Sequence, residues 1–329
     1  MKRTSIVFIL LVVGLSLAFA AGATENKSAP AFPAGRPITM ICPWAPGGGS
    51  DVGARILAPY LEKRLGTTIN IINPTGASGW VGWERMLSGQ SDGYTFSMIN
   101  LPTIFSGYLD PSLGRNKTID DFQMLANHVT DYNGIGIRTN ETRFTDLNSL
   151  IAYAKSNPVT MTTTGVGTQQ HILILLFNEA NGINITSVPG SGFADSFAAL
   201  KGNHVDAVVG SVGEMRNPAK NGELKPIILF SEDKVDLMPD VPVWNKLGMG
   251  KNIVVSSQRA FAVKKGTPPE IVKILSDAMK DAITDPEQIA KMKDLGLQVD
   301  YVAPDAFAKH AKSEEAKIAG LAGLMGWKK

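Results

Sequence analysis

The sequence predicts an α/β protein in which parallel or mixed sheets carry helices on their faces, and three observations lead to this prediction. Short apolar segments alternate with helical patterns along the chain, as in sheets joined by crossover helices. Two junctions between a strand and the next helix are rich in glycine, at residues 46–51 and 165–171. Removal of the first 20 residues would leave 329 − 20 = 309, which favours two domains because single cores rarely grow so large.

The first 20 residues have the pattern of a secretory signal peptide. Lys2 and Arg3 precede an apolar run at 6–19, and Ala18-Phe19-Ala20 has the A-x-A form of a cleavage site. The run is shorter than the roughly 20 apolar residues that a membrane-spanning helix needs. We therefore expect an exported protein, in which residues 21–35 form a disordered polar tail.

The first strand is expected at 38–44, followed by the first glycine-rich turn and a helix that begins at about Asp51. Gly66 ends this helix as a left-handed cap residue would. Its core-facing stripe consists of apolar residues at helical spacing: Val52, Ile56, Leu57, Tyr60 and Leu61.

The alternation continues to the end of the chain. Further strands are expected at 68–72, 94–99, 160–164, 183–188, 205–209 and 225–230. Helices are expected at 81–87, 146–156, 169–181, 194–201 and 305–324. Two more helices should follow Thr267-Pro268-Pro269-Glu270 and Asp285-Pro286-Glu287-Gln288, because each tetrapeptide reads as a capping box with proline at the first helical position.

The two glycine-rich turns are the candidate binding features. In Pro46-Gly47-Gly48-Gly49-Ser50-Asp51 the glycines allow close approach of the backbone, and the following helix directs its free N–H groups and positive dipole end to the same place. Thr164-Gly165-Val166-Gly167-Thr168 repeats the arrangement before a second helix. One such corner can be an ordinary tight turn. Two of them, in a chain with two domains, favour a clamp on one anion.

Two side chains near these turns need a separate interpretation. A carboxylate at Asp51 would repel an anion, and its spacing to Arg55 suits an ion pair on one helix face. We therefore interpret Asp51 mainly as a cap and organiser of the loop, with direct ligand contact as the alternative. His171 lies in the first turn of its helix, where the dipole disfavours the imidazolium, so we expect either a neutral hydrogen-bonding histidine or a packed or solvated one.

Several classes of function are disfavoured. Loss of Lys2 and Arg3 takes the formal charge from +2 to 0, so the mature chain lacks the basic surplus of nucleic-acid-binding proteins. Neither turn matches a dinucleotide fingerprint or a P-loop, and the four histidines lack metal-site spacing. We expect no cofactor and no metal. Cys42 is the single cysteine, so it forms no internal disulfide and should be a buried thiol.

A serine hydrolase remains the enzymatic alternative. Ser50 or Ser78 could act as a nucleophile with His171 as the base. The chain has no nucleophile elbow, because Trp80 stands where the second glycine of G-x-S-x-G would follow Ser78. This disfavours catalysis.

Taken together, the motifs resemble those of the extracytoplasmic solute receptors of tripartite tricarboxylate transporters, the TctC or Bug family. The resemblance extends from about residue 36 to 326, and the order and spacing of the motifs make it specific. The motifs are the signal peptide, P-G-G-G-S-D with Arg55, Asn73-x-x-Gly76-Ala77-x-Gly79, Ser91-Asp92-Gly93-Tyr94, Gly165-x-Gly167-Thr168-x-x-His171, Val188-Pro189-x-x-Gly192, Gly202-x-x-Val205-Asp206 and Asp240-Val241-Pro242.

The resemblance implies a periplasmic-binding-protein fold with a cleft between two lobes. It places residues 36–134 and 260–329 in the first lobe and 135–259 in the second, with crossing segments near 134–138 and 254–263. It implies a monomeric periplasmic receptor without catalytic activity, which delivers a small carboxylated solute to permease subunits in the membrane. Such a solute could be a di- or tricarboxylate, an amino acid or an aromatic acid, and a role in signalling stays open.

The resemblance also assigns the ligand site and shows where this chain departs from the family. After Val188-Pro189 the family usually has an aromatic and a basic residue, whereas Gly190 and Ser191 stand here, which implies room for a bulkier or less charged ligand. Trp44, Trp80 and Trp83 border the loops, so ligand closure should change tryptophan fluorescence unless these rings are core. The expected ligand contacts are Trp44, Pro46, Gly47, Gly48, Gly49, Ser50, Asp51, Ser78, Thr164, Gly165, Val166, Gly167, Thr168, His171, Gly190 and Ser191.

Overall fold

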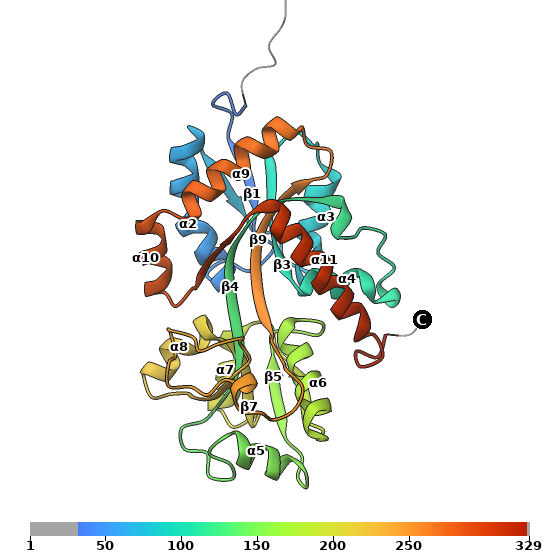
Figure 1. Ribbon diagram of the computed structural model, residues 1–329, viewed down its shortest axis with the longest axis vertical. Helices are drawn as coiled ribbons and strands as arrows, with labels where there is room; N and C mark the ends of the chain where they lie inside the picture. The colour runs from blue at the N-terminus through green and yellow to red at the C-terminus, as the bar shows by residue number, and fades with distance from the viewer. Residues whose placement is uncertain (1–31, 328–329) are drawn as a thin grey trace, which may run out of the picture.

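The computed structural model describes residues 32–327, so the signal peptide expected at 1–20 and most of the expected tail lie outside the described residues. Figure 1 shows two α/β lobes, one above the other, connected by long strands. In the part of the chain described here, no helix combines the length and the apolar character needed to cross a membrane.

The first lobe, at the top of Figure 1, is built on a mixed sheet. Strand β1 (Ile38–Ile41) lies parallel between β2 (Ile69–Ile72) and β3 (Thr95–Leu101). The next strands are antiparallel: β9 (Ser256–Lys264) pairs with β3 and with β4 (Phe122–Ile137), and β10 (Val299–Val302) pairs with β4. The helices of this lobe are α2 (Gly49–Leu65), α3 (Trp80–Ser88), α4 (Thr103–Leu109), α9 (Pro269–Ile283), α10 (Pro286–Asp294) and α11 (Pro304–Gly320).

The second lobe has the same plan. Strand β5 (Thr160–Thr163) is parallel to β6 (Thr186–Pro189) and β7 (Ala207–Ser211), and the end of β4 lies antiparallel between β7 and β8 (Lys225–Leu229). Its helices are α5 (Leu147–Ala154), α6 (Gln169–Asn181), α7 (Phe193–Lys201) and α8 (Val212–Lys220). Short 3-10 turns lie at Ala77–Gly79, Pro111–Leu113, Ile119–Asp121 and Trp244–Lys246.

Hydrophobic clusters cover both faces of each sheet. In the first lobe, α2 and α9 bury residues such as Leu57 and Leu275 on one face, while Trp80, Trp83 and Phe307 fill the other. In the second lobe, α5 and α6 pack on one face and α7 and α8 on the other. This double coverage explains why the strands read as short apolar runs.

The lobes are joined where β4 changes sheet. Its residues up to Tyr132 pair with β9 in the first lobe, and its residues from Asn133 pair with β7 in the second. The chain returns beside this point, because the Asn133 amide donates to the Val255 carbonyl at 2.9 Å. The expected second lobe of 135–259 therefore needs correction at both ends: residues 133–134 belong to it, and 256–259 belong to β9 of the first lobe.

Several local predictions need correction as well. Helix α2 begins at Gly49, two residues before the expected start. No side chain caps α9, because the Thr267 hydroxyl donates to the Lys264 carbonyl at 2.7 Å instead. Asp285 does cap α10, but Gln288 completes no box and contacts His128. Residues 32–35 of the expected disordered tail form a turn, fixed by the Tyr94 hydroxyl, which donates to the Pro33 carbonyl at 3.0 Å.

The α/β fold class itself is confirmed, and α6 begins and ends at the expected residues. Thr168 caps its start and Gly182 ends it with a left-handed φ of 61°. Gly66 closes α2 in the same way with a φ of 65°. Cys42 is a buried free thiol, and burial raises its pKa to about 11. Elements without a local signal, namely α4, α8, β9, β10 and most of β4, were not expected.

Candidate ligand-binding cleft

The first glycine-rich turn is organised by Asp51, whose side chain is almost completely buried. Its Oδ2 accepts hydrogen bonds from the Gly47 amide at 2.9 Å and from Arg55 Nε at 2.8 Å, and its Oδ1 accepts one from Asn73 Nδ2 at 2.9 Å. Burial alone would raise the pKa of Asp51, but these donors together lower it. The expected pairing with Arg55 is confirmed. Asp51 is not the helix cap, because that position belongs to Gly48.

The second turn is held by the cap of α6 and by a neutral histidine. The Thr168 hydroxyl donates to the Gly165 carbonyl at 2.8 Å and accepts from the His171 amide at 3.5 Å. The Gly167 amide donates to His171 Nδ1 at 3.2 Å, so this nitrogen carries no proton. Burial lowers the pKa of His171. The histidine therefore supports the loop as a neutral acceptor.

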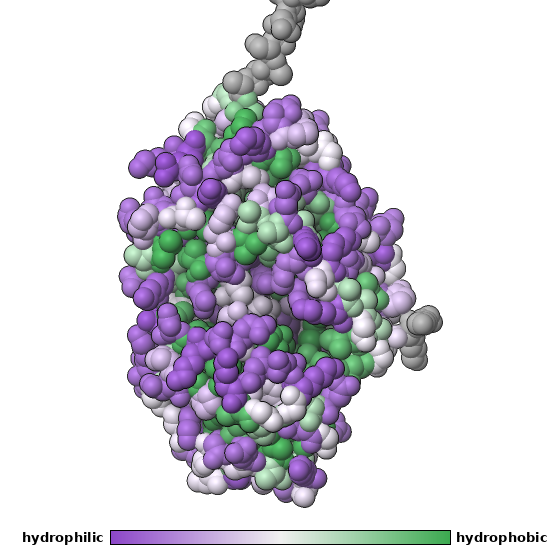
Figure 2. Space-filling view, viewed as in Figure 1, coloured by the Kyte–Doolittle hydropathy of each residue, from purple (hydrophilic) through white to green (hydrophobic). Residues whose placement is uncertain are grey.

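The two turns face each other across the lobes. Ser106 Oγ of α4 donates to the Gly167 carbonyl at 2.7 Å, and Thr103 Oγ1 donates to Gln169 Oε1 at 3.2 Å. Ile172 of α6 belongs to a hydrophobic cluster of the first lobe. Apolar residues also gather in Figure 2 where the lobes meet, beside α6 and the end of α11. The lobes are thus closed on each other.

Between the turns lies a cavity of about 170 Å³ with walls from both lobes. The first lobe supplies Trp44, Ala45, Gly48, Gly49, Ser50, Asn100, Thr103, Ser257 and Arg259, and the second lobe supplies Thr164, Thr168, Gln169, Ser191, Gly192, Phe193 and Glu214. This interlobe cavity lies at the start of both α2 and α6, where backbone N–H groups and dipoles favour an anion.

The expected ligand contacts fall into three groups. The first lines the interlobe cavity and consists of Trp44, Gly48, Gly49, Ser50, Thr164, Thr168 and Ser191. The second lines a neighbouring cavity next to α4 and the C-terminal end and consists of Ser78, Val166 and Gly167. The third lines neither cavity and consists of Pro46, Gly47, Asp51, Gly165, His171 and Gly190.

Of the tryptophans near the loops, only Trp44 reaches the interlobe cavity. Its Nε1 donates to Asn100 Oδ1 at 2.6 Å. Trp80 and Trp83 are completely buried in the first lobe, where the Trp83 indole donates to the Met98 carbonyl at 2.8 Å. Their rings are core, so the expectation of a fluorescence change rests on Trp44.

The third cleft loop does not open the expected space. A side chain at Gly190 would meet Ser196 Oγ at 3.0 Å and the Thr163 carbonyl at 3.3 Å. Phe193 of the same loop lines the interlobe cavity and stacks on Phe197 at 5.9 Å between ring centroids. An aromatic ring, that of Phe193, thus lies beside the cavity although Gly190 itself has no side chain. This geometry does not support the prediction of room for a bulkier ligand.

Arg259 of β9 is the main site residue that the sequence analysis does not select. Its side chain is 6% exposed, and its Nη2 donates to Asp131 Oδ2 at 3.2 Å. Its Nε and Nη1 are buried, with no hydrogen-bond partner among residues 32–327. A Cβ at Gly49 would lie 3.3 Å from Nη2. The glycine turn thus brings the backbone at the start of α2 next to the Arg259 guanidinium, whose Nε and Nη1 can still donate hydrogen bonds.

Glu214 of α8 faces the same cavity from the second lobe. Its Oε2 accepts from the Ser211 amide at 2.9 Å and from Gln170 Nε2 at 3.3 Å, while Gln170 Oε1 accepts from the Thr164 amide at 2.7 Å. Within the described residues no cation forms an ion pair with it. Burial raises its pKa.

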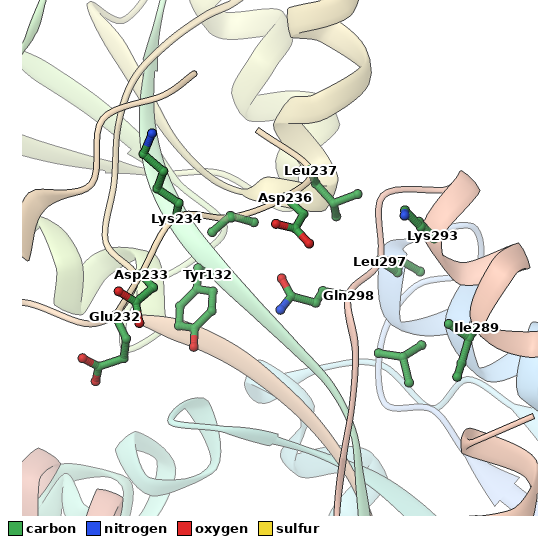
Figure 3. A pocket seen from close by; sticks show the side chains of 12 residues that line it. Tyr132, Glu232, Asp233, Lys234, Asp236, Leu237, Ile289, Lys293, Leu297 and Gln298 are labelled. Carbon is green, nitrogen blue, oxygen red and sulfur yellow. The ribbon is translucent and has the colours of Figure 1, made fainter. Parts of the chain in front are cut away.

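A second candidate cavity, of about 380 Å³, lies beside β4. Figure 3 shows Glu232, Asp233 and Asp236 on one side of it, and Ile289, Lys293, Leu297 and Gln298 on the other. It contains neither glycine turn nor the start of a helix that points inward. Three carboxylates line it against two lysines, Lys234 and Lys293, and this balance of charge disfavours an anion.

No catalytic arrangement forms around the candidate serines. Ser50 lines the interlobe cavity, whereas Ser78 lines the neighbouring one. Neither serine hydrogen-bonds to His171, whose Nδ1 is occupied by the Gly167 amide. Over residues 32–327, no group of three or more histidines, cysteines and acidic residues is placed to hold a metal ion.

Comparison with known proteins decides the family. The family model described as "Tripartite tricarboxylate transporter family receptor" matches residues 53–323. The chain belongs to this family. The resemblance seen in the motifs is therefore confirmed, and the family is one of binding proteins rather than enzymes.

A curated relative and two solved structures show how far the similarity to this receptor extends. The chain is 29% identical to Protein BugT of Bordetella pertussis over 97% of its own length and 98% of the relative's. It superposes on the periplasmic binding protein BugD with a TM-score of 0.78 and 26% identity, covering 89% of this chain and 99% of BugD. MatC of Rhodopseudomonas palustris, solved with bound malate, gives a TM-score of 0.77 at 24% identity, covering 87% and 98%.

Proposed function

We propose that this receptor binds a small carboxylated solute in the interlobe cavity, on the outer side of the cytoplasmic membrane, and delivers it to a membrane permease. The observation that carries the proposal is the meeting of two strand-to-helix turns around one cavity that also holds the Arg259 guanidinium. The start of α2, the start of α6 and Arg259 all favour negative charge at this place.

The energetics support a role for Arg259. A helix terminus contributes roughly 0.3–1 kcal/mol to anion binding, whereas micromolar affinity corresponds to about 8 kcal/mol. The two helix termini are therefore insufficient alone. Charge-assisted hydrogen bonds contribute about 1.5–3 kcal/mol each, and the buried Nε and Nη1 donors of Arg259 have no other partner in the described chain. Closure of the lobes then removes the ligand from water.

The hinge required for such closure follows from the topology. Within residues 32–327, only β4 and the segment at Val255 carry the chain between the sheets of the two lobes. The other contacts across the cleft include side-chain hydrogen bonds such as that of Ser106 to Gly167, and the packing of Ile172 on the first lobe. Few hydrogen bonds must therefore break when the two lobes separate. This is the geometry of hinge closure around a ligand.

The comparisons support a carboxylate as the solute class. Two structural neighbours from Rhodopseudomonas palustris were solved with carboxylates, MatC with malate and another protein with adipate. Export to the periplasm is supported by the signal-peptide pattern at residues 1–20 and by the periplasmic relative BugD. Delivery to permease subunits is supported by the family to which the chain belongs.

A binding screen tests this proposal. We expect at least one compound from a panel of mono-, di- and tricarboxylic acids and amino acids to raise the melting temperature and to titrate calorimetrically with one site. Arg259→Gln should weaken that binding at least about tenfold, which corresponds to 1.4 kcal/mol. Arg85→Gln is the matched control, because Arg85 is exposed on α3. Absence of binding across the panel, or equal affinity in the two variants, would contradict the proposal.

A further inference from the structure

The interlobe cavity contains one cation and one anion. Among the described residues that line it, Arg259 is the only basic side chain and Glu214 the only acidic one. They come from opposite lobes, Arg259 from β9 and Glu214 from the first turn of α8. A ligand held between the closed lobes therefore meets a positive group on one side and a carboxyl on the other.

Among the described residues, these two side chains form no ion pair with each other, although Arg259 lowers the pKa of Glu214 through its charge. Arg259 pairs with Asp131 at 3.2 Å, which leaves Glu214 without an ion-pair partner in residues 32–327. Other basic groups nearby supply no compensation. Arg55 pairs with Asp51, and burial lowers the pKa of His128 to about 3, so that it is neutral. Arg259, Asp131 and the half-buried Glu214 thus carry a net charge of −1 when all three are ionised.

Glu214 is also held rigidly toward the cavity. Its carboxylate completes the capping box of α8 with Ser211 and accepts from Gln170, which is itself fixed to the backbone of Thr164. Capping α8 requires only one oxygen of the Glu214 carboxylate, and a solvent-exposed side chain would serve equally well. Here the carboxyl is half-buried in the wall of the cavity, and this burial raises its pKa, which is a cost that a cationic partner would offset.

We infer that the solute is zwitterionic, with its carboxylate at Arg259 and the start of α2 and an ammonium group at Glu214. The inference rests on the proposed function. It narrows the solute class to amino acids, whose carboxylate and ammonium groups together carry no net charge. A dicarboxylate would set its second negative charge against Glu214 inside a cavity of about 170 Å³. An amino acid would instead place its carboxylate at Arg259 and an opposite charge at Glu214.

Matched ligands test this inference without any change to the protein. Calorimetric affinities are compared within sets that share a carbon skeleton: L-alanine, L-lactate and propionate; L-aspartate, L-malate and succinate; L-glutamate, 2-hydroxyglutarate and glutarate; L-phenylalanine, 3-phenyllactate and 3-phenylpropionate. We expect the tightest ligand to be an amino acid that binds at least about tenfold more tightly than the other two members of its set. The hydroxy acids separate a need for positive charge from a need for any hydrogen-bond donor.

The variant Glu214→Gln then assigns the preference to one residue. Its amide oxygen can still accept from Ser211 and Gln170, so the fold should survive, which circular dichroism verifies. We expect the preference for the amino acid over its deaminated partner to fall to within about threefold, with the affinity for the deaminated acid unchanged or higher. Glu232→Gln, at an exposed residue of the cavity beside β4, should keep the wild-type preference.

The outcomes separate the inference from the proposed function. If a hydroxy acid or a plain carboxylate binds as tightly as every amino acid, or if Glu214→Gln keeps the preference, the inference is wrong while carboxylate binding stands. If no member of the sets binds, and no carboxylate of the wider panel does, the proposed function fails and the inference with it.

Discussion

Asp131 and Arg259 form a buried ion pair, with 3.2 Å between Asp131 Oδ2 and Arg259 Nη2. Asp131 lies in β4 next to the point where the strand changes sheet, and its Oδ1 accepts from the amide of Gly213 in the second lobe at 3.2 Å. The carboxylate that orients the cavity guanidinium therefore also touches the opposite lobe. Burial raises the pKa of Asp131, although Arg259 and its other donors lower it.

The two partners of this ion pair should be energetically coupled. Removing one partner leaves a buried charge without compensation, so Asp131→Ala and Arg259→Gln should each lower the free energy of unfolding by about 3–5 kcal/mol. The double variant should lose clearly less than the sum, because it leaves neither partner of this pair as an uncompensated charge. Urea unfolding of the four proteins gives the coupling energy. Additive losses would show that the pair does not act as a unit.

Asp51 should support the first turn rather than touch the solute. Asp51→Ala removes the acceptor of Gly47, Arg55 and Asn73, so we expect a loss of about 2–3 kcal/mol in unfolding free energy together with weaker solute binding. Asp277→Ala breaks the exposed pair with Lys273 at the same helical spacing and should change stability by less than about 0.5 kcal/mol. Equal effects in urea unfolding would contradict the role of Asp51.

Acid stability should depend on Glu141 in the second lobe. Hydrogen bonds from Arg143, and from Arg138, lower its pKa to about 2 despite burial. Because the folded pKa lies below the unfolded one, the contribution is present above about pH 4.5 and is lost as the pH falls toward 2. It amounts to roughly 3 kcal/mol. Glu141→Gln should therefore be less stable at pH 7 and show a flatter loss across this window in urea unfolding. Parallel curves for wild type and variant would refute this.

Tryptophan fluorescence should report solute binding through Trp44. This ring lines the interlobe cavity and donates to Asn100, whereas Trp80 and Trp83 are sealed in the core. Saturating solute should shift the emission of the wild type, and Trp44→Phe should remove the shift while calorimetry still detects binding. A shift that persists in Trp44→Phe would place the reporter elsewhere.

Much of the fold can be predicted because its signals are local. Thr168 and Gly182 bracket α6, and Gly66 ends α2, as cap residues do. Strand β4 is harder, because Asn127, His128 and Asp131 interrupt its apolar pattern. These side chains are buried and contact partners distant in the sequence, such as Asp300 and Gln288. A local pattern cannot contain that information.

The candidate site divides in the same way. The glycine turns are contiguous in sequence, so their residues were selected, and Asp51 was correctly paired with Arg55. Arg259 and Glu214 lie on a strand and a helix that are brought to the cavity only by the crossing of the lobes. Nothing in the neighbourhood of either residue distinguishes it from a surface charge. The small size of Gly190 does not create free space, because Ser196 Oγ and the Thr163 carbonyl lie next to it.

A crystal structure with the tightest solute of the binding screen tests the central claim most directly. We expect one ordered molecule between the lobes, with its carboxylate at the first turn of α2 and within hydrogen-bond distance of Arg259. A solute bound outside the interlobe cavity, for instance in the cavity between Glu232 and Gln298 beside β4, or inside it without contact to Arg259 and α2, would contradict this account.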